Sequence, residues 1–255
     1  MKLKLIFAFL TLMFILTKPS YSDVLNDAQF EFSQGNIRYS AGEYEQAITN
    51  YEKALSFGFE SGPLYYNLAN AYFKSGSLGK AVLNYIRAQR LIPNDADLIS
   101  NLNYARSRIK GGGVSAQRSW LMREFFKLAS SFSLDKITSI SFGLYLILSV
   151  LIILIILLKD LRKVLTYISV AAAVLLAAAF SIFLTQFNRV VIQKEAIVVA
   201  EAADSKFEPL DEATTFFSLS EGEDVLVVTT KAGWVKIKRP DGKQGWVKKV
   251  TVEQV

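Results

Sequence analysis

Two long uncharged apolar runs, separated by only five residues, place the strongest constraint on how this chain can fold. The runs cover residues 137–158 and 164–187, and the segment between them, 159–163, contains three basic residues. A helix needs about 20 apolar residues to cross a bilayer, and a connection this short forces the second helix to turn back beside the first. The sequence therefore predicts a hairpin of two transmembrane helices, 137–158 and 164–187, joined by a loop over 159–163.

The N-terminus indicates which side of the membrane the rest of the chain occupies. Lys2 and Lys4 precede an uncharged run, and small residues follow at Ser20 and Ser22. This layout is typical of a secretory signal over 1–22 with cleavage after Ser22, the alternative being an uncleaved anchor. Basic loops stay in the cytoplasm, so we expect an inner (cytoplasmic) membrane protein whose two flanking domains lie on the periplasmic or extracytoplasmic side.

The composition excludes most enzyme chemistry. The chain contains no His and no Cys, which removes imidazole bases, thiolate nucleophiles, disulfides and ordinary zinc sites. No arrangement of Ser, Lys and carboxylates suggests an activated nucleophile. We therefore expect no catalytic, cofactor-binding or metal-binding residues, no cofactor, and a protein that is not an enzyme.

The positive charge does not indicate nucleic-acid binding. The net charge is +6, and the excess of basic residues lies in the leader and in residues 111–192, around the apolar runs. Basic residues in these places contact lipid head groups and orient insertion. We expect the membrane and proteins as partners, and no nucleic acid.

Residues 23–110 contain an internal repeat with a period of 34 residues. The matching pairs are Gly35/Ala69, Gly42/Gly76, Ala47/Ala81, Tyr51/Tyr85 and Ala54/Ala88. This pattern resembles the tetratricopeptide (TPR) repeat, a helix–turn–helix unit of about that length. The resemblance implies an α-solenoid with repeats at about 28–61 and 62–95 and a closing helix over 97–110. Gly42 and Gly76 are expected to form the turns between helices.

TPR solenoids hold a partner on the concave face formed by the first helix of each repeat. Carried over to this sequence, that face includes Phe32, Asn36, Tyr39, Tyr66, Asn67, Asn70, Phe73, Lys74 and Asn101. An asparagine side chain both donates and accepts hydrogen bonds, so it is suited to an extended peptide backbone. The alternative is that these asparagines only cap or solvate their helices.

Two features beside the apolar runs suggest further contacts. Gly111 to Gly113 predict a flexible joint, and Leu121, Phe125, Leu128 and Phe132 follow a helical spacing within 111–136. That helix is expected either in the head-group plane or packed on a neighbouring domain.

In the second apolar run, small residues recur every fourth position and predict close helix packing in the membrane; they are Ser169, Ala173, Ala177 and Ser181.

Residues 193–255 change to short β-rich runs separated by turn signals. The runs are 197–199, 225–229, 234–238 and 245–247, which favours a small all-β domain. The glycine before the second strand and the two Gly-Trp pairs around an Asp-Gly hairpin resemble the bacterial SH3-like domain, which implies a small β-barrel. Trp234 and Trp246 are expected to pack rather than to stack on a ligand.

The order of these modules carries a further resemblance. A signal, two TPRs, a two-span hairpin and an SH3-like domain are together similar to the Bacteroides aerotolerance (Bat) family, in its BatE type. That resemblance implies von Willebrand A-type membrane proteins and a MoxR-type AAA+ ATPase as partners, in envelope stress tolerance. The sequence thus predicts a mainly α, multidomain, non-enzymatic scaffold for protein–protein interactions. The alternative is a cell-wall protein that binds peptidoglycan through its SH3-like domain.

Overall fold

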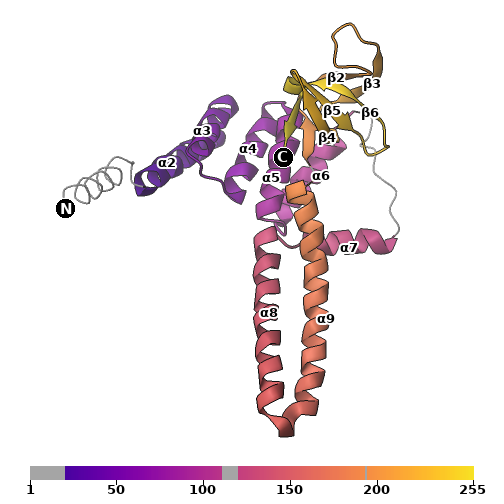
Figure 1. Cartoon of the computed structure of the whole chain (residues 1–255). Helices are drawn as coiled ribbons and strands as arrows, with labels where there is room; N and C mark the ends of the chain where they lie inside the picture. The colour runs from indigo at the N-terminus through magenta and orange to yellow at the C-terminus, as the bar shows by residue number, and fades with distance from the viewer. Residues whose placement is uncertain (1–20, 111–119, 193) are drawn as a thin grey trace, which may run out of the picture.

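The computed structural model describes residues 21–110, 120–192 and 194–255 (Figure 1). The predicted leader, apart from its last two residues, and the predicted joint at Gly111 to Gly113 lie outside the described residues. The described chain forms a helical solenoid, a long helical hairpin and a C-terminal β-sheet. The solenoid and the sheet lie together at one end of the hairpin (Figure 1).

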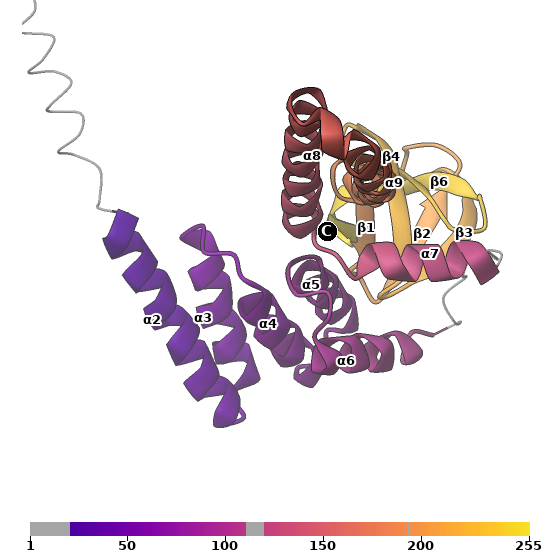
Figure 2. The same ribbon diagram turned by 90° about the horizontal axis from the view of Figure 1, so that it is seen from below.

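The solenoid consists of five helices that stack in sequence order (Figure 2). They are α2 (Tyr21–Ser40), α3 (Tyr44–Ser56), α4 (Gly62–Lys74), α5 (Leu78–Leu91) and α6 (Ala96–Ser107). Helices α2 and α3 form the first pair, α4 and α5 the second, and α6 closes the stack against α5. This arrangement confirms the predicted helical repeats.

Glycines at repeat positions form the predicted turns and allow a close contact between helices. Gly42 and Gly76 adopt φ values of +80° and +90° between the helices of each pair, a conformation that only glycine adopts without strain. A Cβ atom on Gly35 would lie 2.4 Å from Cε1 of Tyr51, so α2 and α3 approach each other closely because this residue has no side chain. Helix α4 begins at a cap in which the Ser61 hydroxyl accepts a hydrogen bond from the Leu64 N–H at 3.3 Å.

The hairpin is formed by α8 (Leu134–Leu157) and α9 (Arg162–Phe187), joined by the short turn η1 (Lys159–Leu161). Mean hydropathy reaches 3.0 in α8 and 2.4 in the segment that contains α9, and both helices are long and apolar enough to cross a membrane. Of the predicted packing stripe, Ser169 is buried while Ala173, Ala177 and Ser181 are exposed. A step of four residues is slightly longer than one helical turn. The line of small residues therefore winds around α9 and leaves the face that contacts α8.

Helix α7 (Trp120–Ser130) lies across the hairpin rather than along it (Figure 1). The buried side chain of Gln186, near the end of α9, donates from Nε2 to the carbonyl oxygens of Ala129 at 2.5 Å and Phe132 at 2.8 Å. Carbonyls at a helix end lack partners inside the helix, so Gln186 fixes the end of α7 to α9. Phe125 and Leu128 of the predicted stripe remain 37% and 53% exposed. The side chain of Leu121 lies outside the described residues.

The C-terminal sheet contains seven antiparallel strands in the order β3-β2-β6-β5-β4-β1-β7. Their bounds are β1 (Glu195–Val198), β2 (Ala202–Lys206), β3 (Thr215–Ser220), β4 (Asp224–Lys231), β5 (Trp234–Lys238), β6 (Gln244–Lys248) and β7 (Val252–Gln254), with the short turn η3 (Lys249–Thr251) before β7. The four predicted runs overlap β1, β4, β5 and β6. Trp234 is buried and Trp246 is half-buried, as expected for side chains that pack.

The predicted closed β-barrel is wrong. Among the described strands no ladder joins β3 to β7, the two ends of the order. The reason lies in β1, where Val198 packs into the core of the sheet while Ile197 packs into the core of the solenoid. Because helix α5 covers this end of the sheet, the apolar surface there is buried without closure of the sheet on itself.

Gly79, in the first turn of α5, lies directly against the sheet. A Cβ atom on Gly79 would lie 2.4 Å from the carbonyl oxygen of Val198. The Gly79 N–H donates to Oε1 of Glu221 at 2.7 Å, whereas the N-cap residue Ser77 makes no side-chain capping bond. A carboxylate at a helix N-terminus is stabilising, so the sheet domain supplies the charge that α5 lacks.

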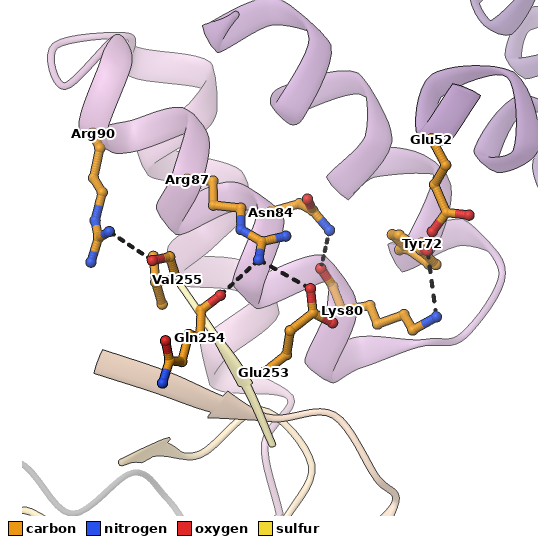
Figure 3. A network of polar contacts seen from close by, with 9 residues as sticks. All are labelled: Glu52, Tyr72, Lys80, Asn84, Arg87, Arg90, Glu253, Gln254 and Val255. Atoms are coloured by element: carbon orange, nitrogen blue, oxygen red, sulfur yellow. Dashed lines mark hydrogen bonds and ion pairs between the residues drawn. The ribbon is translucent and has the colours of Figure 1, made fainter. Parts of the chain in front are cut away.

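Arginine side chains of α5 extend this contact along the last strand (Figure 3). Nη2 of Arg87 donates to Glu253 Oε1 at 3.0 Å and to the Gln254 carbonyl at 2.7 Å. Nη1 of Arg90 donates to the main-chain oxygen of Val255 at 2.9 Å. Two further ion pairs cross the interface, Arg90–Glu195 at 3.1 Å and Arg106–Asp224 at 3.2 Å. The solenoid and the sheet therefore form one interlocked unit.

We expect Gly79→Ala to destabilise this unit because its methyl group has no space against Val198. Overpacking of this kind costs about 1–3 kcal/mol. Gly143→Ala is the matched control, since no atom lies within 4 Å of a Cβ there. Chemical denaturation in detergent measures the free energy of unfolding. Equal stability of the two variants would contradict the close approach.

The turn between β4 and β5 generates a second prediction. Ala232 has a φ of +46° and Gly233 a φ of +82°, the combination that two-residue hairpins favour as Asn-Gly. An alanine there carries a strain of about 1–2 kcal/mol, which asparagine largely avoids. Ala232→Asn should therefore raise the free energy of unfolding by about 1 kcal/mol, whereas Ala232→Val should lower it. Thermal unfolding of both variants checks the sign.

Candidate partner-binding groove

The first helix of each repeat and the closing helix contribute polar and aromatic side chains to one face of the solenoid. Asn36 comes from α2, Asn67 and Asn70 from α4, and Asn101 from α6. All four side chains are half-buried. They are positioned by a hydrogen-bond pattern that recurs with the sequence repeat.

In the first layer, Oδ1 of Asn36 accepts two hydrogen bonds. The Tyr51 hydroxyl donates to it at 2.8 Å, and Nδ2 of Asn67 donates to it at 2.8 Å. Tyr51 comes from α3 and Asn67 from α4, so the three residues connect three successive helices.

The same arrangement occurs 34 residues later. Oδ1 of Asn70 accepts from the Tyr85 hydroxyl at 2.6 Å and from Nδ2 of Asn101 at 3.2 Å. Each residue of the first layer thus has its repeat equivalent in the second. The asparagines are a structural part of the repeat, which the 34-residue pattern of small and aromatic residues alone did not predict.

The two tyrosines are held as hydrogen-bond donors. Burial raises the pKa of the Tyr51 and Tyr85 hydroxyls well above the ordinary tyrosine value, because a phenolate is poorly solvated inside the solenoid. Both hydroxyls therefore stay protonated and keep the amide oxygens of Asn36 and Asn70 as acceptors.

This network restricts what the groove offers to a ligand. An amide oxygen has two acceptor sites, and both are occupied in Asn36 and Asn70. Asn101 uses both Nδ2 hydrogens, because it also donates to the Tyr66 hydroxyl at 2.9 Å. Asn36 and Asn70 therefore retain only donors for a ligand, and Asn101 retains only its acceptor. The expectation that each asparagine offers a ligand both a hydrogen-bond donor and an acceptor is therefore corrected.

A cavity of about 380 Å³ opens in the second layer of this face. Its lining residues are Tyr39, Tyr66, Asn70, Phe73, Lys74, Tyr85, Asn101 and Tyr104. Six of these belong to the predicted set. Lys74 is the one charged residue of the lining, at the exposed rim.

Three predicted residues lie away from this cavity, and two cavity residues were missed. Phe32, Asn36 and Asn67 do not line it; the ring of Phe32 packs 5.9 Å from that of Tyr51. In the sequence, Tyr85 was identified only as the repeat equivalent of Tyr51. Tyr104 lies 34 residues after Asn70, so its repeat equivalents are asparagines and the residue type does not identify it; its ring lies 5.6 Å from that of Phe73.

The described residues show no metal centre. In residues 21–110, 120–192 and 194–255, no group of three or more Asp or Glu side chains is placed to hold a metal ion. The groove itself is lined by tyrosine hydroxyls, amides and aromatic rings, with Lys74 at the rim.

Comparison with protein families identifies the helical repeats. The TPR repeat family matches residues 35–76, and the tetratricopeptide repeat family matches residues 62–95. The second match has the bounds expected for repeat two. A search of curated proteins finds no match to the chain. The solenoid therefore carries TPR repeats, which generally act as non-catalytic scaffolds for protein partners.

Removal of the Tyr85 hydroxyl should test the repeated network. We expect Tyr85→Phe to lower the free energy of unfolding by about 1 kcal/mol, because the donor to Asn70 is lost. Tyr104→Phe is the control, since this side chain is 56% exposed and should change stability little. In a double-mutant cycle, Tyr85→Phe and Asn70→Ala should be less than additive; full additivity would refute the coupling.

Proposed function

We propose that this protein is a non-enzymatic, membrane-anchored scaffold that holds an extended segment of a protein partner in its TPR groove. The observation that carries the proposal is the open cavity beside the asparagine network. The sheet covers α5, the second helix of its repeat, whereas the residues that line the groove, apart from Tyr85, lie on α2, α4 and α6. The face that binds ligands in TPR solenoids is thus left uncovered.

The lining of the cavity suggests the chemistry of the segment. Aromatic walls at Tyr39, Tyr66 and Phe73 favour an apolar or aromatic anchor side chain. The remaining Nδ2 donors of Asn36 and Asn70 suit backbone carbonyls of an extended chain. Lys74 at the rim favours an acidic residue beside the anchor.

The hairpin gives the proposed scaffold its anchor. We infer that α8 and α9 cross the inner membrane with η1 in the cytoplasm, because that turn carries Lys159 and is followed by Arg162 and Lys163. The solenoid and the sheet then lie together on the extracytoplasmic side. The exposed Ala173, Ala177 and Ser181 are available to a partner helix.

The Bat family resemblance supplies candidate partners. The order of TPRs, hairpin and SH3-like sheet supports a BatE-type role beside von Willebrand A-type membrane proteins and a MoxR-type ATPase. The sheet is an SH3-like domain in this proposal, open between β3 and β7, with β1 docked on the solenoid.

A second candidate function is binding of cell-wall peptidoglycan by the sheet domain. One observation favours it: Phe207 and Phe216, beside the loop between β2 and β3, are 58% and 41% exposed with ring centroids 4.4 Å apart. Exposed aromatic rings are suited to stack on sugars. If Phe207→Ser with Phe216→Ser abolishes sedimentation of the detergent-solubilised protein with wall material, the wall is a ligand; unchanged sedimentation would exclude this surface.

The groove is tested by replacing three of its residues together. We expect Asn36→Ala with Tyr39→Ala and Asn70→Ala to reduce recovery of cross-linked membrane partners by at least about tenfold, as loss of a few central contacts does. Gln46→Ala with Thr49→Ala, on the exposed side of α3, is the control. Circular dichroism confirms folding of both variants. Unchanged recovery by the groove variant would contradict the proposal.

A further inference from the structure

A larger cavity, of about 580 Å³, lies where the solenoid, the sheet and the hairpin meet. Arg87 and Arg90 of α5 line it on the solenoid side, and Gln254 and Val255 on the sheet side. Ser130, Ser133 and Gln186 line it on the hairpin side. This cavity shares no lining residue with the partner-binding groove.

The cavity lies at the level where the apolar helices begin. Leu134 and Asp135, the first two residues of α8, and Gln186, the last but one of α9, belong to its lining. If α8 and α9 span a bilayer, this level is that of the lipid head groups.

A second cavity, of about 420 Å³, continues from the first along α8. The two share Phe132 and Asp135, and the second extends to Ser139 and Ile140. Ile140 is 43% exposed on the surface of α8, where acyl chains would lie. The pair of cavities therefore leads from a polar chamber to an apolar helix face.

The solenoid side of the chamber offers donors to a phosphate. The hydrogen bonds of Arg87 to the sheet use only Nη2, which leaves Nε and Nη1 of a guanidinium suited to phosphate oxygens. Nε of Arg90 is buried without a hydrogen-bond partner.

The chamber also contains acidic side chains. Glu60 and Asp135 line it, and both are exposed. Carboxylates beside a phosphate site oppose a purely anionic ligand, but they bind a ligand that also carries an ammonium group. The chamber therefore combines both signs of charge.

We propose that this cavity binds the head group of a phospholipid that carries both a phosphate and a primary ammonium, as phosphatidylethanolamine does, with its acyl chains along α8. The phosphate lies at Arg87 of α5 and the ammonium at Asp135 of α8, while Glu60, beside the Tyr65 ring that Arg87 faces, limits the binding of purely anionic ligands. The inference rests on the membrane hairpin of the proposed function and not on the groove.

Lipid selectivity tests the proposal on the full chain. The detergent-solubilised protein is mixed with phosphatidylethanolamine, phosphatidylcholine or phosphatidylglycerol of identical acyl chains, and bound lipid is measured by native mass spectrometry. We expect phosphatidylethanolamine to be retained about tenfold better than the other two lipids. The choline ammonium of phosphatidylcholine donates no hydrogen bond, and the terminal glycerol of phosphatidylglycerol carries no positive charge. Equal retention of the three lipids would overturn the proposal.

Variants on the acidic side avoid damage to the interface with the sheet. Asp135→Asn with Glu60→Gln should remove the preference and make phosphatidylglycerol at least as good a ligand. Asp160→Asn, an exposed acidic residue at the opposite end of the hairpin, is the matched control and should preserve the preference. Unchanged selectivity in the Asp135 variant would overturn the assignment of the ammonium.

Two further arms separate the sources of failure. Glycerophosphoethanolamine, the same head group without acyl chains, should compete at least about tenfold more weakly than the lipid; equal competition would assign the site to a soluble ligand and overturn the lipid proposal. The groove variant Asn36→Ala, Tyr39→Ala and Asn70→Ala should retain lipid normally. Loss of partner recovery with normal lipid binding, or the reverse, distinguishes failure of one proposal from failure of the other.

Discussion

The contact of Gly79 with strand β1 is the constraint on which the rest of the arrangement depends. No side chain fits between the α5 backbone and the Val198 carbonyl, and Glu221 of the sheet completes the N-terminus of α5. The equivalent residue of the first repeat is Glu45, an acidic residue in the first turn of α3. The second repeat therefore has a glycine where the first has its own N-terminal charge, and it receives that charge from another domain.

This docking determines which surfaces remain for partners. Helix α5 is covered by β1 and β7, and its arginines are paired with the sheet. The asparagine network keeps the opposite, first-helix face ordered, and the cavity there stays open. Nδ2 of Asn94, between α5 and α6, donates to the carbonyl oxygen of Ser131, just after α7, at 3.0 Å, and Gln186 ties α7 to α9, so the solenoid is linked to the hairpin. Under the proposed function, a partner in the groove would be held at a defined place beside the membrane.

Much of this architecture was predictable from the sequence, because local patterns encode it. The 34-residue spacing gave the helical repeats, the uncharged runs gave α8 and α9, and alternation gave four of the seven strands. The contacts between domains were not predictable, since Gly79 resembles any helix-start glycine and Ile197 any strand residue until both are placed in space. The same limit explains why the prediction of a barrel was wrong. Whether the sheet closes depends on the element that covers β1, and that element, helix α5, lies far from β1 in the sequence. Tyr104 was missed because the two earlier repeats have asparagine at its position, so the residue types do not match.

A distance measurement across the interface tests the central claim most directly, and the chain contains no cysteine to interfere with it. Arg106→Cys on α6 and Asp224→Cys on β4 replace an exposed ion pair of 3.2 Å with two reactive thiols. If the solenoid and the sheet are interlocked, a short bis-maleimide reagent joins these thiols within one molecule, and a protease cut in residues 111–119 no longer separates the two parts under reducing denaturation. Linkage no better than that of an Arg38→Cys and Asp224→Cys pair would contradict the account.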